Sequence, residues 1–198
     1  MQNESWLRSL AWTDYRLAIL FTVVIPLILL IWAFVQKSAG IQRLLMIYWR
    51  VSSLLLITLY LMIASWPIAF LSSLLARILI PISIWFWVDI NEEIDDMQPR
   101  PLKLAVQAWR WAITTYCILG TLAIIPFLPC AFSQGLIKTT YCQVWLEAPW
   151  LYKAFFHANS RPDFLGGLGM FALIIYVFSL SYFVLVRLGK QGRSALQQ

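Results

Sequence analysis

The feature that most constrains the fold is a set of long apolar segments without charged residues. Residues 17–35 form 19 such positions and residues 164–186 form 23. Each segment is long enough for a helix to cross a hydrocarbon core, which takes about 20 residues. Hydrophobic residues make up 61% of the 198-residue chain and charged residues 12%, so a soluble domain could not bury its apolar surface. The chain is therefore predicted to be an integral membrane protein that forms one all-α domain.

The number of spans depends on residues 51–88, which are 38 positions with a single charge, Arg77. One helix of this length would measure about 57 Å, far more than one bilayer. We expect two short spans, with a break near Trp66 and Pro67 or near Ser72 and Ser73, because proline interrupts helices. A further short helix at 144–156 should lie in the membrane interface. The predicted spans are roughly 17–35, 48–68, 70–88, 104–128 and 164–186, and a four-span bundle is the alternative.

The distribution of lysine and arginine predicts the orientation, because cytoplasmic loops of membrane proteins are enriched in both. An outer N-terminus with five spans puts nine basic residues inside and five outside, whereas four spans give eight and six. We expect a lumenal or outer N-terminus and a cytoplasmic C-terminus. The nine inner residues are Lys37, Arg43, Arg50, Arg100, Lys103, Arg110, Arg187, Lys190 and Arg193. The net charge of +6 therefore belongs to the span flanks, and no nucleic-acid partner is expected.

An acidic run at 89–96 holds five of the nine carboxylates of the chain. If it continues the third span as a helix, four of them share one face and require a counter-charge, a divalent cation or a basic partner. Arg77 would pair with Asp89, reach a lipid phosphate or a partner carboxylate, or mark a span end. These charged residues are the interaction candidates: Asp89, Glu92, Glu93, Asp95, Asp96 and Arg77.

Two cysteines lie in the longest predicted connection, residues 129–163, which the five-span topology places outside. Cys130 and Cys142 should form a disulfide in an oxidising compartment, and two free thiols are the alternative. Neither cysteine spacing nor the single histidine, His157, makes a zinc ligand set or a bis-histidine haem site. No catalytic motif is present, so we assign no catalytic, metal or cofactor residues and expect no required cofactor. Bound lipid or an occasional pigment is compatible with the chain.

Part of the acidic run, NEEIDD at 91–96 followed by RPL at 100–102, resembles the first aspartate-rich motif of UbiA-type intramembrane prenyltransferases. That resemblance implies carboxylates that hold magnesium for a prenyl diphosphate. The chain departs from that family because it has about half as many spans and no second aspartate-rich cluster.

Three segments, WTDYRLA at 12–18, YWR at 48–50 and WVDINEEI at 87–94, are similar to an uncharacterised integral membrane family of cyanobacteria. The resemblance implies a thylakoid or plasma membrane and a role near photosynthetic or respiratory complexes. We therefore expect a non-catalytic accessory, assembly or stabilising subunit whose partners are the lipid bilayer and other membrane proteins. The alternatives are a magnesium-dependent isoprenoid or lipid enzyme that uses residues 89–96, and a small carrier or channel.

Overall fold

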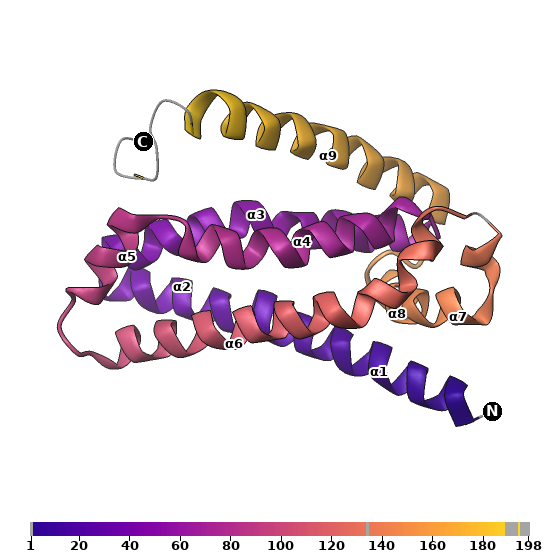
Figure 1. Cartoon of the computed structure of the whole chain (residues 1–198), viewed down its shortest axis with the longest axis horizontal. Coiled ribbons are helices and arrows are strands. Elements are labelled where there is room, and N and C mark those ends of the chain that lie inside the picture. The colour runs from indigo at the N-terminus through magenta and orange to yellow at the C-terminus, as the bar shows by residue number, and fades with distance from the viewer. Residues whose placement is uncertain (1, 134, 189–193, 195–198) are drawn as a thin grey trace.

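The computed structural model describes residues 2–133, 135–188 and 194 (Figure 1). It is 87% helical and contains no strand within these residues. Five helices are long and apolar enough to cross a membrane: Ser5–Val35, Ala39–Ile63, Ile68–Trp85, Pro101–Ala131 and Pro162–Val186. The predicted all-α bundle with five spans is confirmed.

The first span is a continuous rod of α1 (Gln2–Ala18), the π-helical turn η1 (Ile19–Val24) and α2 (Ile25–Val35). Pro26 has no N–H, so the carbonyl of Thr22 loses its helical partner and the helix widens there. The hydroxyl of Tyr48 donates to the Thr22 carbonyl at 2.7 Å, and Trp109 Nε1 donates to that of Phe21 at 2.9 Å. Side chains from other helices thus satisfy the carbonyls that the turn exposes.

The helix that contains this span begins well before the predicted span start at residue 17, because the apolar helix Ser5–Val35 is continuous. The predicted span started after Arg16 because it excluded charged residues. The helix includes both Arg16 and Asp14 and begins at Gln2. A carboxylate can lie inside a span when the bundle supplies a counter-charge, and it does here, as described below.

The next two spans, α3 (Ala39–Ile63) and α4 (Ile68–Trp85), form an antiparallel hairpin. The turn between them includes Ser65, at a positive φ of 55°, followed by Trp66 and Pro67, as one of the two predicted breaks requires. The other predicted break is wrong, because Ser72 and Ser73 are buried inside α4. The helix that contains the second predicted span, 48–68, begins earlier, at Ala39.

The acidic run does not continue the third span. Trp87 has an extended conformation between α4 and a separate short helix, α5 (Val88–Asp95). The chain then enters α6 (Pro101–Ile124), which ends in the 3-10 turn η2 (Ile125–Ala131). The condition that the run continues the third helix is thus not met. The two buried isoleucines of α5, Ile90 and Ile94, dock this short helix across the end of the bundle instead.

Short helices cover the opposite end of the bundle: η3 (Leu136–Lys138), α7 (Thr140–Gln143), η4 (Val144–Leu146) and α8 (Glu147–Phe156). The last span, α9 (Pro162–Tyr182) with the π-helical turn η5 (Phe183–Arg187), lies on the outer side of the α3–α4 hairpin (Figure 1). It packs closely on α3 where Gly166 and Gly169 leave no room for a side chain. Two apolar cores fill the bundle, one at the α5 end and one at the α8 end.

Candidate functional site

The centre of the bundle holds a buried ion pair between two different spans. Arg77, in the middle of α4, donates from Nη2 to Asp14 Oδ2 of α1 at 2.6 Å. The two side chains are only 7% and 17% exposed. The sequence pointed to Arg77 as an intramembrane charge, but the carboxylate that it pairs with is Asp14 and not Asp89, which was one of the alternatives. Asp14 was assigned no role because it appeared to precede the first span.

A third span, α6, completes the polar cluster. The hydroxyl of Tyr116 donates to Asp14 Oδ1 at 3.1 Å, and Arg77 Nη1 donates to the Gly120 carbonyl at 2.7 Å. Gly120 is required here because a Cβ would lie 2.5 Å from Arg77 Nη1. The guanidinium also lies 5.9 Å from the centre of the Tyr116 ring. The pair thereby ties α1, α4 and α6 together at one depth.

Two buried polar atoms in this part of the bundle make no hydrogen bond within the described residues. One is Arg77 Nε of α4, and the other is Thr121 Oγ1, adjacent to Gly120 in α6. Buried polar groups of this kind are costly in a helix bundle. Each of these two atoms therefore has room for one more hydrogen bond. Cys117, the free cysteine of α6, is buried among apolar side chains.

A second arginine is almost fully buried at the α5 end of the bundle. Arg110 of α6 is 2% exposed, donates from Nη2 to Asn91 Oδ1 at 2.7 Å and lies 4.0 Å from the Trp85 ring centre. Trp85 Nε1 donates in turn to Thr114 Oγ1 at 3.0 Å. Arg110 was expected among the basic residues that flank the spans, but its side chain is buried inside the protein. It binds an amide of the acidic run rather than a lipid headgroup.

The carboxylates of the acidic run have separate environments. Glu93 accepts from Arg43 Nη1 at 3.4 Å and lies against Gly40, in the first turn of α3, where a negative charge is favourable. Asp89 accepts from Ser194 at 3.1 Å. Gln107 Nε2 donates to Asp95 at 3.4 Å. Glu92 and Asp96 are exposed.

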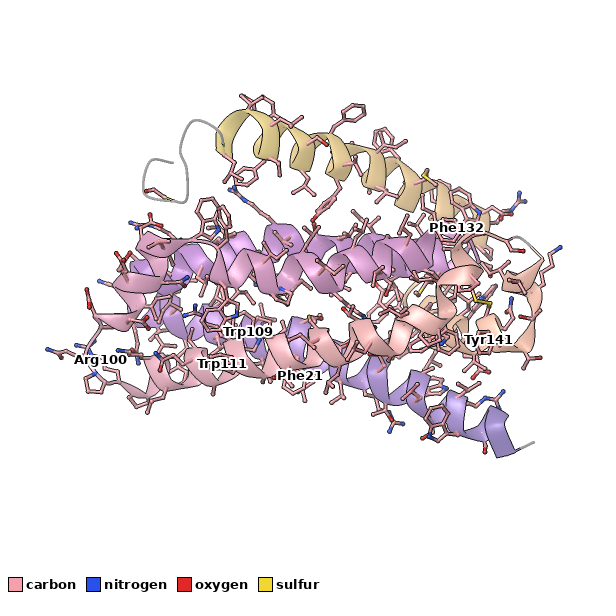
Figure 2. The ribbon with its side chains drawn as sticks, viewed as in Figure 1. Phe21, Arg100, Trp109, Trp111, Phe132 and Tyr141 are labelled. Atoms are coloured by element: carbon pink, nitrogen blue, oxygen red, sulfur yellow. A yellow bond between two sulfur atoms is a disulfide. The ribbon has the colours of Figure 1, made fainter. Side chains whose placement is uncertain are left out.

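Lys103, one of the two basic residues that follow the run, binds backbone carbonyls rather than carboxylates. Lys103 Nζ donates to the carbonyls of Asp95 and Met97 at 2.6 and 2.8 Å, so a cation caps the C-terminal end of α5. Arg100 is exposed and lies in the turn before α6 (Figure 2). Among the described residues, no three histidine, cysteine, aspartate or glutamate side chains are grouped closely enough to hold a metal ion.

A disulfide joins Cys130 of η2 to Cys142 of α7, with the two Cα atoms 6.1 Å apart. Both cysteines are buried in the core at the α8 end. This bond closes the loop between the fourth span and α8. The helix predicted at 144–156 is α8, which begins at Glu147 and ends at Phe156. It starts later than predicted because Val144, Trp145 and Leu146 form a buried 3-10 turn before it.

Helix α8 is attached to α1 by Glu147 and leaves its aromatic end uncovered. Arg8 Nη2 donates to Glu147 Oε1 at 2.8 Å, and Trp12 Nε1 donates to the other carboxylate oxygen at 3.4 Å. Phe155 and Phe156, at the other end of α8, are exposed. His157 accepts or donates a 2.9 Å hydrogen bond with the Tyr60 hydroxyl, which links the end of α8 to α3.

These features define a five-span helical membrane protein with an internal ion pair and a disulfide-closed cap at one end. The chain belongs to the family of proteins of unknown function DUF3177, whose model matches residues 8–196. The predicted membership of an uncharacterised integral membrane family is confirmed. No curated protein and no solved structure matches the chain.

Proposed function

We propose that this protein is a non-catalytic accessory, assembly or stabilising subunit of a larger membrane complex. The observation that carries the proposal is an aromatic stripe on the outer face of α9. Phe164, Phe171 and Phe178 recur every seven residues and are 62%, 65% and 72% exposed. Leu185 continues the stripe at the same spacing. A seven-residue repeat keeps one seam of a helix facing a neighbouring helix along its whole length.

The internal pairing of charges supports the same proposal. Arg77 is neutralised by Asp14, and Arg110 is bound to Asn91 and stacked on Trp85. The two polar clusters thereby connect elements of this chain to each other and stabilise a rigid body. A rigid body with an apolar outer helix is suited to docking against other spans, where association depends on packing rather than on the hydrophobic effect.

We place the protein in the thylakoid or plasma membrane of a cyanobacterium, next to a photosynthetic or respiratory complex. The resemblance of residues 12–18, 48–50 and 87–94 to a cyanobacterial family supports this location. The lysine and arginine distribution favours a lumenal or outer N-terminus and a cytoplasmic C-terminus. Without the buried Arg110, eight inner basic residues still outnumber five outer ones.

Purification of the tagged protein in mild detergent, followed by native electrophoresis, tests this proposal. We expect stoichiometric co-migration with a larger membrane complex. The triple variant Phe164→Leu, Phe171→Leu, Phe178→Leu should migrate alone, because it removes aromatic surface without adding charge. Phe34→Leu is the matched control, since Phe34 is an exposed phenylalanine on α2. Migration of the wild-type protein by itself would refute the subunit proposal.

A small carrier is the second candidate, and the Arg77–Asp14 pair favours it because ionisable residues within a span commonly mark transport paths. Flux through vesicles that contain Arg77→Ala tests this candidate. Unchanged flux of every ion and small solute tested would count against a carrier.

A further inference from the structure

A groove separates the C-terminal half of α9 from the α3–α4 hairpin. Figure 1 shows α9 next to the hairpin at the α8 end and farther from it toward the α5 end. The groove has a volume of about 560 Å³ and is lined largely by apolar side chains, among them Ile47, Leu79, Ile82 and Leu180. This volume lies in the range of about 300–1,000 Å³ that is typical of ligand sites.

Contacts across the groove fix its two sides. The hydroxyl of Tyr176 on α9 donates to the Val51 carbonyl of α3 at 3.3 Å. Further along, the Phe183 ring meets the buried Trp87 ring edge-on, with centroids 5.9 Å apart. The groove is thus bounded by specific contacts and has a definite width.

Among the side chains that the structure describes, one charged group, that of Arg50 on α3, lines this apolar groove. Arg8, Arg43 and Arg77 form ion pairs with carboxylates, whereas within the described residues Arg50 forms none. Arg50 lies near the middle of α3, and Trp87, which also lines the groove, is buried. A charge inside a span is stabilised when its long side chain extends toward the membrane surface and a lipid headgroup is drawn toward it. An arginine with apolar surface beside it can then bind a phosphate while the apolar surface holds a hydrocarbon chain.

We infer that this groove binds an anionic glycerophospholipid. One acyl chain lies between α9 and the α3–α4 hairpin, and the lipid phosphate accepts hydrogen bonds from Arg50. The lipid completes the packing of α9 on its inner side. The inference does not depend on the proposed accessory function, which concerns the outer face of the same helix.

Native mass spectrometry of the delipidated protein tests the inference, with palmitoyl-oleoyl-phosphatidylglycerol and the matching phosphatidylcholine as probes. We expect preferential binding of phosphatidylglycerol. Arg50→Gln should weaken that binding about fivefold, the effect of removing one basic residue from a lipid headgroup. Arg50→Lys should retain the preference, because it keeps the charge. Arg100→Gln is the control, since Arg100 is an exposed basic residue outside the groove.

A second variant tests the acyl-chain position. Ser179 lines the groove, so Ser179→Trp should fill it and abolish binding of both lipids. Val177→Trp is the matched control, because Val177 is exposed on α9 and does not line the groove. Far-UV circular dichroism checks that each variant is folded. Equal binding of the two lipids, equal losses in Arg50→Gln and Arg100→Gln, or full binding by a folded Ser179→Trp variant would each overturn the inference.

Discussion

Removing the negative charge of the buried ion pair should destabilise the protein strongly. Asp14→Asn keeps the size of the side chain but leaves Arg77 charged inside the bundle. With a 2.6 Å contact the two charge centres are about 4 Å apart, which corresponds to about 4 kcal/mol at an effective dielectric constant of about 20. Loss of one partner of a buried pair typically costs about 3–5 kcal/mol. The remaining bond to Gly120 offsets part of this, so we expect a loss of about 3 kcal/mol in the free energy of unfolding.

The double variant Asp14→Asn, Arg77→Met tests whether the effect comes from the unpaired charge. Replacing both partners by uncharged groups removes the buried charge, so its stability should return to within about 1 kcal/mol of wild type. The assay is reversible unfolding in mixed micelles, followed by tryptophan fluorescence. Arg8→Gln is the control, because the Arg8–Glu147 pair is exposed and should contribute less than about 1 kcal/mol.

Two outcomes would refute this reasoning. One is a cost for Asp14→Asn that is no greater than the cost for Arg8→Gln. The other is strict additivity of the two single variants at positions 14 and 77, because contacting charges must show a coupling energy in a double-mutant cycle.

The other predictions concern packing, the cap and the second buried arginine. Gly120→Ala should lower the free energy of unfolding by about 1–3 kcal/mol, measured by thermal unfolding, because its Cβ would overlap the guanidinium of Arg77. Gly167→Ala is the control and should be nearly neutral, because a Cβ at that position meets open space. Equal effects of the two variants would contradict this prediction. Reduction of the Cys130–Cys142 bond should lower the stability of the cap by about 3 kcal/mol, measured by proteolysis with and without reductant, and unchanged cleavage would argue against a structural disulfide. Arg110→Lys should speed hydrogen exchange in α5 about tenfold, since lysine cannot both stack on a ring and reach the same amide, and unchanged exchange would show that α5 is held in another way.

The two buried arginines have different structural roles. Arg77 joins three spans through a carboxylate and a carbonyl, whereas Arg110 holds the short helix α5 through an amide and an aromatic ring. Arg110 therefore depends on the fold of the acidic run, and the acidic run depends on Arg110. This mutual dependence explains why Asn91, the uncharged polar residue of that run, points into the bundle.

Segment length and composition were sufficient to predict the class of fold. Long charge-free segments require helices in a bilayer, because backbone polar groups have no water partner there. Proline at position 67 located the turn of the α3–α4 hairpin, and the apolar pattern at 144–156 located α8 to within a few residues. These features are local, so periodicity and backbone chemistry determine them.

The candidate site could be predicted only in part. Arg77 was identified because a lone charge in an apolar stretch is conspicuous, but Asp14 lay next to Arg16 and looked like part of a polar flank. Arg110 similarly lay close to Lys103 and was assigned to the membrane surface. A charge at the edge of a span gives no local signal of whether it faces water or another helix.

The sequence alone thus determined that this protein is a helical membrane bundle, since hydropathy and helix length depend on residues close together in the chain, and it left four spans open beside five. Only the tertiary structure decided the partner of each charge. Asp14, Arg77 and Gly120 come from three spans, and the depth and rotation of each helix bring them within hydrogen-bond distance. Those rotations depend on packing between helices that are distant in sequence, so they cannot be predicted from any short segment.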